Sequence, residues 1–224
     1  MNLGAVIITC PGREDLCHQT VSGLALSDWR NDHPVHVQND TFTCPRRQER
    51  QERNALAALT NALQRLHSDI LLFMEDDLIF NRHLVHNLTC WKPLADFERA
   101  GDHHGYFFGS LYDPNIRELE AFPDEHYFIA DSDAVYGSQC FVMSRAMAEY
   151  FVEHWWEVPG MQDIKMSRLA GGATSGGWSV LPKCPIHYHV PSLVQHVGFK
   201  SAWGGAFHQT RMFDADWKHP VHPA

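Results

Sequence analysis

Three consecutive acidic residues, Glu75, Asp76 and Asp77, directly follow the apolar run ILLFM. The run is typical of a buried strand, and α/β proteins bind ligands at the carboxyl ends of such strands. Adjacent carboxylates repel one another unless a cation compensates their charge, and hard oxygen ligands suit Mg²⁺ or Mn²⁺. A solvated turn that caps the following helix would have the same composition. The strand before the triplet favours a metal site, because it delivers the acids to a fixed place.

Alternating strands and helices are needed to position such a triplet, and the first third of the chain has this pattern. Residues 4–10 are mostly apolar and end at a Pro-Gly pair, and apolar residues recur at helical spacing over 16–26. A short strand is expected at 35–37 and a helix through 55–67, followed by the strand that opens after Asp69. This order predicts a three-layer α/β fold with a mainly parallel central sheet. The expected apolar face of the second helix consists of Leu56, Leu59, Leu63 and Leu66.

The second half of the chain is less regular. Strands are expected at 106–111, 139–143 and 190–197, where apolar residues cluster between turn-forming residues. Ser144 is a candidate N-cap for a helix that runs to about Trp156, because a serine hydroxyl can accept a hydrogen bond from the first helical turn.

A glycine-rich segment, GGATSGG, covers Gly171 to Gly177. Many enzymes close such a loop over a bound ligand to exclude water. An ordinary flexible loop would have the same composition, so the sequence leaves both interpretations open.

The composition of the 224 residues, 44% apolar and 20% charged, is typical of a globular protein. No internal repeat or linker is visible, so residues 1–224 are expected to form a single domain. The formal net charge of -9 excludes a uniformly basic surface for nucleic acid. The sequence has no CxxC pair, no signal-peptide pattern at its start and no apolar run long enough for a membrane span. We therefore expect a cytoplasmic protein without membrane insertion, whose oligomeric state stays open.

The stretch DILLFMEDDLIF resembles the DxD-type strand end of glycosyltransferases with the GT-A fold. The resemblance implies a GT-A (Rossmann-like) three-layer fold and a metal-dependent enzyme that uses a nucleotide-sugar donor, expected to be UDP-linked. It also implies that Asp77 ligates Mn²⁺ or Mg²⁺ beside the donor diphosphate, and that Glu75 is the acid on the nucleotide side. Asp76 is a further donor-site candidate. Glutamate in the first position departs from a literal DxD.

Further segments resemble the same superfamily in the same order along the chain. The stretch VIITCPGREDLCHQTVSGL resembles the first strand and helix of these enzymes. The pair Asn39-Asp40 resembles the end of their second strand, and the pair Arg53-Asn54 resembles the Arg-Asn that precedes their donor-site helix. GSQCFVMSRAMAEYF resembles the strand and helix that follow the sugar pocket. The donor-site residues that these resemblances imply are Thr9, Pro11, Arg13, Asp40, Arg53, Asn54 and Gln139, the last with Gly137 and Ser138 beside it.

The late stretch HVPSLVQHVGFKSA resembles the PSL(F/V)QHVG segment of the family that includes the Golgi N-acetylglucosaminyltransferase IV. A late histidine often completes the metal shell in GT-A enzymes, which makes His196 a second metal ligand. Neutral imidazole is a competent ligand for Mn²⁺. A lone histidine is more often a hydrogen-bonded core or surface residue. His187 and His189 alternate as in a strand and would face the same side, so they are an alternative metal pair with His196.

Asp163 is the candidate general base, because inverting transfer requires a carboxylate that removes the proton of the attacking acceptor hydroxyl. It follows Pro159-Gly160 and opens a predicted helix, where the resemblance implies the base. A structural N-cap would occupy the same position. If the reaction instead retains configuration, Asp163 need not act as a base.

Together these features predict a hexosyl- or N-acetylhexosaminyltransferase. The alternatives are a sugar nucleotidyltransferase, a metal-dependent phosphoesterase and a non-catalytic nucleotide-sugar binder. The first would normally show a basic glycine-rich loop after the first strand, which TCPGRED does not match. The acceptor is expected to be a saccharide, another glycoconjugate or a small molecule. A hydroxylated DNA base is a minority hypothesis, based on the basic run from Arg46 to Arg53.

Overall fold

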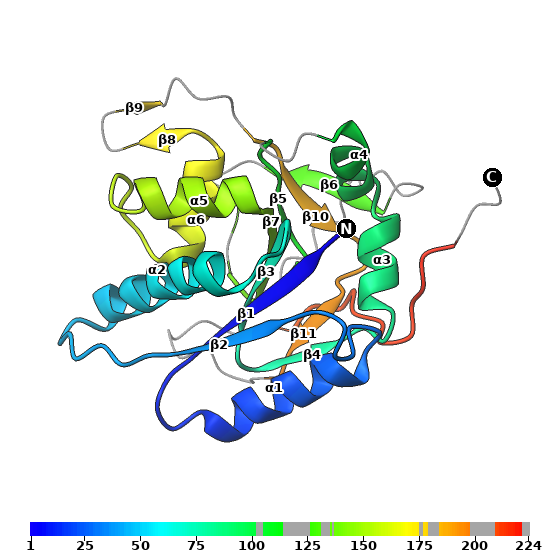
Figure 1. The fold of residues 1–224 in the computed structure, drawn as a ribbon, viewed down its shortest axis with the longest axis horizontal. Coiled ribbons are helices and arrows are strands. Elements are labelled where there is room, and N and C mark those ends of the chain that lie inside the picture. Colours follow the sequence, from blue (N-terminus) through cyan, green and yellow to red (C-terminus); the bar gives the residue numbers. More distant parts are fainter. Residues whose placement is uncertain are drawn as a thin grey trace.

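A seven-stranded sheet crosses the middle of the molecule in the order β2-β1-β3-β7-β5-β10-β6 (Figure 1). The computed structural model describes residues 1–101, 105–113, 126–130, 135, 137–174, 177–178, 184–197 and 209–220. The strands of this sheet are β1 (Leu3–Thr9), β2 (Val35–Asn39), β3 (Ile70–Glu75), β5 (Phe108–Ser110), β6 (Tyr127–Ala130), β7 (Cys140–Ser144) and β10 (Ile186–His189).

Most strands of the sheet point in one direction. β1 lies parallel to β2 on one side and to β3 on the other, and β5 lies parallel to β10. β7 is antiparallel to both of its neighbours, β3 and β5, and β6 is an antiparallel edge strand. The sequence-based prediction of a mainly parallel α/β sheet is therefore confirmed, with β7 and β6 as the two reversed strands.

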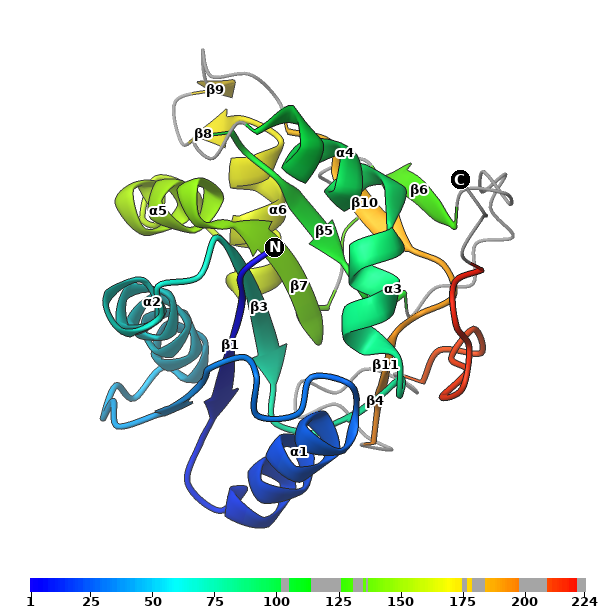
Figure 2. The ribbon, with the colours of Figure 1, turned by 45° about the vertical axis from the view of Figure 1, so that its right-hand side comes forward.

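Helices cover both faces of the sheet, so the molecule has three layers (Figures 1 and 2). Alternate residues of a strand point to opposite faces. Val6 of β1 and Phe73 of β3 therefore pack in the core with α2, α5 and α6, whereas Ile7 and Leu72 pack on the other face with α1, α3 and α4. The helices are α1 (Glu14–Leu26), α2 (Arg47–Arg65), α3 (Leu84–Cys90), α4 (Lys92–Ala100), α5 (Arg145–His154) and α6 (Gln162–Ala170). None of the helices in the described part of the chain is long and apolar enough to cross a membrane.

The buried face of α2 differs in part from the predicted leucine face. Ala55, Ala58 and Ala62 are inaccessible to solvent together with Leu59. Leu56 and Leu63 of the predicted face are only partly buried at the edge of the same core. Leu59 and Leu66 of the predicted face are buried as expected, and the small alanine side chains beside them let the helix lie close to the sheet. For α5, the predicted N-cap is confirmed, because the Ser144 hydroxyl accepts a hydrogen bond from the Met147 amide at 3.2 Å.

The predicted strand at 190–197 is wrong as a single element. β10 ends before Val190, which a cis peptide bond joins to Pro191, and a separate strand β11 (Val194–His196) follows. Proline has no amide hydrogen and interrupts a strand ladder. β11 pairs antiparallel with β4 (Leu78–Phe80), with His196 opposite Leu78. This small second sheet places His196 next to the acidic triplet, because Leu78 directly follows Asp77.

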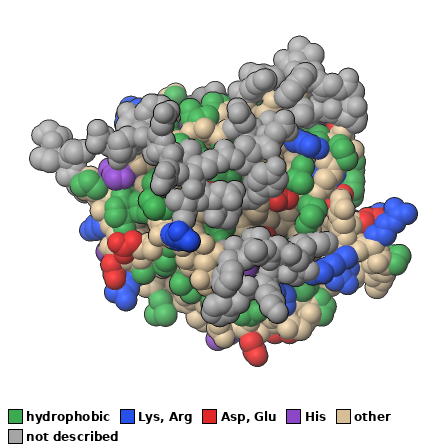
Figure 3. All heavy atoms as spheres, turned by 180° about the vertical axis from the view of Figure 1, so that it is seen from behind, with side chains coloured by type: hydrophobic (Ala, Val, Ile, Leu, Met, Phe, Trp, Pro, Cys, Tyr) green, Lys and Arg blue, Asp and Glu red, His purple; other side chains and the backbone are tan. Residues whose placement is uncertain are grey.

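The glycine-rich segment from Gly171 to Gly177 contains a short two-stranded contact. β8 (Ala173–Thr174) pairs antiparallel with β9 (Gly177–Trp178). Residues 175–176 lie outside the described part of the chain, so the lid hypothesis stays a prediction. On the face shown in Figure 3, acidic and basic side chains are interspersed, as expected for a chain without a uniformly basic surface.

His189 is an unusual core residue, because its imidazole is inaccessible to solvent. Its ring packs against Trp91 and Trp217, with 5.4 Å between ring centroids in each pair. Its Nδ1 lies 2.7 Å from the Pro191 carbonyl oxygen, so the proton of the neutral ring is on Nδ1 and donates to that oxygen. Burial lowers the pKa of His189 to about 3.

Acidification is therefore expected to destabilise the fold through His189. An exposed histidine has a pKa of about 6.5, so protons bind the unfolded chain more readily than the folded one. The contribution of His189 is complete above this value and is lost as the pH falls toward 3, at up to about 1.4 kcal/mol per pH unit. Urea denaturation at neutral pH and at about pH 5 measures this loss.

In the variant His189→Gln, the loss of stability between the two pH values should shrink. The matched control is His18→Gln, because His18 is exposed. An equal pH dependence in His189→Gln and wild type would contradict the assignment.

Candidate active site

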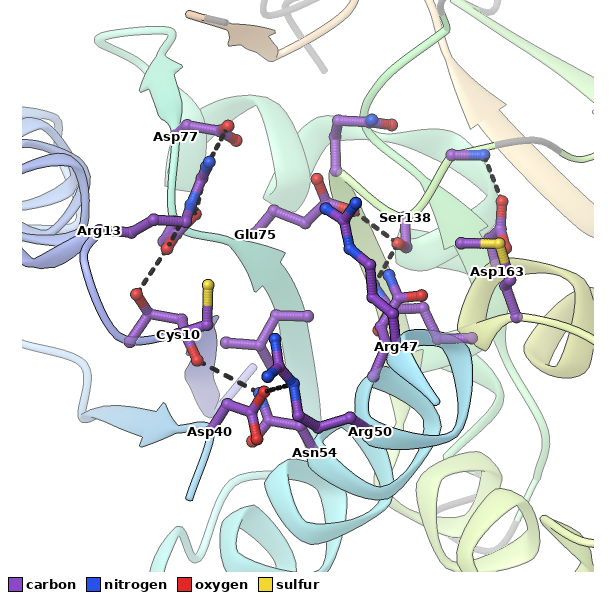
Figure 4. A pocket seen from close by; sticks show the side chains of 18 of the residues that line it. Cys10, Arg13, Asp40, Arg47, Arg50, Asn54, Glu75, Asp77, Ser138 and Asp163 are labelled. Atoms are coloured by element: carbon purple, nitrogen blue, oxygen red, sulfur yellow. Dashed lines mark hydrogen bonds and ion pairs between the residues drawn. The ribbon is translucent and has the colours of Figure 1, made fainter. Parts of the chain in front are cut away.

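The carboxyl ends of β1 and β3 lie side by side, with Ile8 opposite Glu75. A pocket of about 420 Å³ opens at this edge (Figure 4). Parallel strands expose their carboxyl ends at the same edge, where α/β proteins bind ligands. The pocket brings together ten of the residues predicted from the sequence, namely Thr9, Arg13, Asp40, Asn54, Glu75, Asp76, Asp77, Gln139, Asp163 and His196.

Asp76 is held by Arg13 and Thr9. The Arg13 Nε lies 2.9 Å and 3.0 Å from the two carboxylate oxygens of Asp76, and Nη2 lies 2.7 Å from Oδ1. The Thr9 hydroxyl donates to the other oxygen, Oδ2. Hydrogen bonding to Asp76 raises the pKa of Arg13, so its guanidinium is charged at any pH of interest. Both oxygens of Asp76 are thus used within the protein, and this residue anchors the loop between β1 and α1.

Glu75, Asp77 and His196 form a compact group of possible metal ligands, with one ligand atom from each within 4.8 Å of the others. His196 Nε2 lies 3.1 Å from Asp77 Oδ2, and the Arg13 guanidinium also contacts this oxygen. The other oxygen, Oδ1, is buried and has no hydrogen-bond partner among the described residues. Two carboxylates and an imidazole suit Mn²⁺, and the buried Oδ1, without a hydrogen bond in the described part of the chain, offers a cation a ligand atom. The residues therefore fit the metal that the sequence predicted, and Glu75 joins the predicted pair.

The two carboxylates of this group have different acidities. Burial of its carboxyl group raises the pKa of Glu75 to about 7, and the nearby charge of Asp77 adds to this effect. Burial also acts to raise the pKa of Asp77, but His196 and Arg13 outweigh it, so the pKa of Asp77 is lowered. Near neutral pH, Asp77 is therefore ionised, whereas Glu75 is only partly ionised. This difference is expected for two neighbouring carboxylates.

A hydrogen-bonded chain connects Glu75 to the start of α6. The Ser138 hydroxyl donates to Glu75 Oε1 at 2.7 Å, and Gln162 Nε2 donates to the Ser138 oxygen at 2.6 Å. The neighbouring amide of Gly137 donates to Asp163 Oδ2 at 2.8 Å. Residues 137 and 138 thus connect Glu75 with Asp163, and Ser138 lies between these two carboxylates in Figure 4.

The N-cap of α6 is Met161, so Asp163 lies within the first helical turn and is not the cap. Its position depends on Gly137, whose φ of +86° is in the left-handed region. A Cβ at this position would meet only Oε1 at the end of the flexible Gln139 side chain, so the positive φ is the reason that glycine is favoured here. In this conformation the Gly137 amide is directed at Asp163.

The opposite wall belongs to the start of α2. The Asp40 carboxylate pairs with Arg50 at 2.9 Å, and Asn54 Nδ2 donates to the Thr9 carbonyl oxygen at 3.3 Å. Arg47 and Arg50 line the pocket although the sequence interpretation did not select them. Helical spacing was the signal, because these arginines and Asn54 fall on one face at i, i+3 and i+7.

Two predicted donor-site residues, Pro11 and Arg53, are not among those that line the pocket. Pro11 is exposed in the loop after β1. The Arg53 guanidinium pairs with Glu49 at 2.9 Å and lies 5.9 Å from the ring centroid of Trp156. Arg53 is exposed, and its guanidinium is held by these contacts on the surface of α2.

The alternative histidine pair is also outside the pocket. His187 stacks on Phe107, with 5.6 Å between ring centroids, and His189 packs against Trp91. Neither belongs to the group that contains His196 among the described residues.

No protein-family model and no curated protein matches the sequence. Among solved structures, a glycosyltransferase involved in the glycosylation of the major capsid of PBCV-1 matches with a TM-score of 0.52 and 10% identity, over 90% of this chain and 95% of that one. This likeness shows a shared fold. The mannosyltransferase PcManGT from Pyrobaculum calidifontis, in complex with GDP-Man and Mn²⁺, has a TM-score of 0.46 and 14% identity, over 84% of this chain. The present chain covers only 56% of the length of PcManGT.

Replacing Ser138 by alanine is expected to lower the free energy of unfolding by about 1–3 kcal/mol, because a partly buried and a buried polar group lose their partner. These are the carboxylate of Glu75 and the amide of Gln162. Urea denaturation measures the change. The matched control is Ser22→Ala on α1, for which we expect less than about 0.5 kcal/mol. A Ser138→Ala variant as stable as wild type would contradict the role of this chain of hydrogen bonds.

Proposed function

We propose that this protein is a metal-dependent glycosyltransferase that moves a sugar from a nucleotide-sugar donor to an acceptor hydroxyl. The observation that carries the proposal is one pocket that holds both a metal-ligand group, Glu75, Asp77 and His196, and a separate carboxylate, Asp163. A shared fold with a glycosyltransferase is consistent with it. A non-catalytic binder would not need the second carboxylate.

The donor is proposed to lie along the pocket with its diphosphate at the metal-ligand group. Glu75, Asp77 and His196 would hold Mn²⁺ or Mg²⁺, which when bound would stabilise the negative charge of the departing diphosphate. We assign the wall formed by Asp40, Arg50 and Asn54 to the nucleoside. Thr9 and Arg13 are assigned to the nucleotide as a whole. Ser138 and Gln139 lie on the Asp163 side of Glu75 and are assigned to the sugar.

Asp163 is proposed to act as the base of an inverting transfer. Its carboxylate would accept the proton of the acceptor hydroxyl as the oxygen attacks the anomeric carbon. The Gly137 amide, 2.8 Å from Oδ2, fixes the orientation of the carboxylate and leaves further lone pairs for the hydroxyl. The hydrogen-bonded segment 137–139 keeps this base at a constant position relative to Glu75.

The acceptor is proposed to be a saccharide, another glycoconjugate or a small molecule. The run from Arg46 to Arg53 was the basis of the DNA hypothesis, but several of its charges are used within the protein. Arg50 pairs with Asp40 and Arg53 with Glu49. Acidic and basic side chains are interspersed on the face in Figure 3. These observations favour a neutral acceptor over nucleic acid.

A panel of nucleotide sugars, measured by calorimetry with Mn²⁺, Mg²⁺ or EDTA, tests the donor site. We expect metal-dependent binding with a preference for UDP-sugars, because the diphosphate needs a cation between it and the carboxylates. Asp77→Asn and His196→Ala should lose this binding. Asp15→Asn and His18→Ala are matched controls on exposed positions of α1 and should retain it. Equal binding in EDTA would reject the metal-dependent donor site.

Asp163→Asn should bind the donor with unchanged affinity but transfer sugar about 10²–10⁴-fold more slowly, because the base is lost while the donor contacts remain. Transfer to a glycan acceptor and calorimetric donor binding are measured on the same preparation. Full transfer activity would reject Asp163 as the base. Donor binding with no turnover in the wild type, across an acceptor panel, would instead favour a non-catalytic nucleotide-sugar binder.

A further inference from the structure

Arg13 occupies part of the coordination space of the metal-ligand group. Its Nη2 contacts Asp77 Oδ2 (Figure 4). The same oxygen lies 3.1 Å from His196 Nε2. A cation ligated jointly by Asp77 and His196 would use this oxygen. A guanidinium and a divalent cation on one carboxylate oxygen repel each other, and they also compete for its lone pairs.

We propose that Arg13 is an internal counter-cation that metal binding displaces from Asp77 but not from Asp76. The inference rests on the proposed metal site and adds a coupling step to it. Arg13 neutralises the two aspartates when no metal is bound. When a metal is bound, the same side chain becomes a hydrogen-bond donor for the nucleotide.

The contacts of Arg13 are unequal in a way that permits this exchange. Asp76 accepts hydrogen bonds from Arg13 Nε at 2.9 Å and 3.0 Å and from Nη2 at 2.7 Å. Asp77 accepts a hydrogen bond from Nη2 alone. Loss of the Asp77 contact therefore leaves the guanidinium attached to Asp76, which is only 4% exposed. The arginine side chain is 30% exposed, so its outer nitrogens can reach a ligand in the pocket.

Once Nη2 is released from Asp77, it is a charged donor beside the metal-ligand group. Arginine binds phosphate oxygens through such charge-assisted hydrogen bonds. The released donor would favour a diphosphate only after the metal has bound. Arg13 thus makes metal and nucleoside diphosphate bind cooperatively, while it lowers the affinity for the metal alone.

The experiment is a titration of the metal-free protein with Mn²⁺ alone, in which electron paramagnetic resonance counts the free ion. Arg13→Gln should bind Mn²⁺ about tenfold more tightly than wild type, because one charged hydrogen bond at Asp77 no longer competes. Arg50→Gln is the matched control. This variant removes the same charge from the same pocket, but Arg50 pairs with Asp40 rather than with Asp77. The Mn²⁺ affinity of Arg50→Gln should therefore change much less.

The second readout is the affinity for a nucleoside diphosphate at saturating Mn²⁺. This affinity should fall about tenfold in Arg13→Gln, opposite in sign to the change for the metal. Unchanged or weaker Mn²⁺ binding in Arg13→Gln, compared with Arg50→Gln, would overturn the inference while the metal site stands. A wild-type protein that binds no Mn²⁺ would instead overturn the proposed metal site itself.

A measurement on the wild-type protein covers the case in which Arg13→Gln fails to fold. The Nε–H signal of Arg13 in a ¹⁵N spectrum, assigned by its loss in Arg13→Lys, should shift when Mg²⁺ saturates the site. The signal should remain protected by Asp76. An Arg13 signal that does not move at saturating Mg²⁺ would overturn the proposed displacement.

Discussion

Three adjacent carboxylates at the end of a buried strand require compensation, and the rest of the pocket is organised around that requirement. Asp76 receives Arg13 and Thr9, Asp77 receives His196 and Arg13, and Glu75 receives Ser138. These four partners come from three segments of the chain. The loop after β1, the strand β11 and the turn before β7 converge on the end of β3, and each supplies hydrogen-bond donors or positive charge to the acids. Unpaired, such buried charges would destabilise the fold by several kcal/mol.

The late part of the chain is fixed to this strand end by backbone as well as side-chain contacts. β11 pairs with β4, and the Val197 amide donates to the Asp77 carbonyl oxygen at 2.9 Å. Further along the chain, Asn81 Nδ2 donates to the carbonyl oxygens of Asp214 and Trp217, each at 2.8 Å. His196 and Asp77 are more than a hundred residues apart in the sequence, and these contacts bring them together. The metal-ligand group and the packing of the C-terminal segment depend on each other.

The elements that sequence periodicity predicted best are those whose neighbours in space are also neighbours in sequence. β1, α1, β2, α2 and β3 follow one another, and their apolar patterns identified the parallel half of the sheet. The acids at its edge followed from the strand that delivers them. The break between β10 and β11 was missed because apolar residues continue through it, although Pro191 was a visible signal. Arg47 and Arg50 were missed because a run of charges was interpreted by composition rather than by helical face. The contacts of Arg13 with both aspartates could not be predicted, since they depend on how a loop folds back over β3.

The segment 137–139 is the strongest structural argument that the pocket is built for a reaction rather than for binding alone. Gly137 adopts a positive φ that other residues reach only with strain. Its amide is thereby directed at Asp163, while Ser138 next to it donates to Glu75. A binding protein needs the metal-ligand group but has no use for a fixed distance between that group and a second carboxylate. The proposed inverting transfer does, because a base at Asp163 and a leaving group at the metal-ligand group would have to act on the same anomeric carbon from opposite sides. The backbone conformation at Gly137 thus fixes the position of Asp163 relative to Glu75.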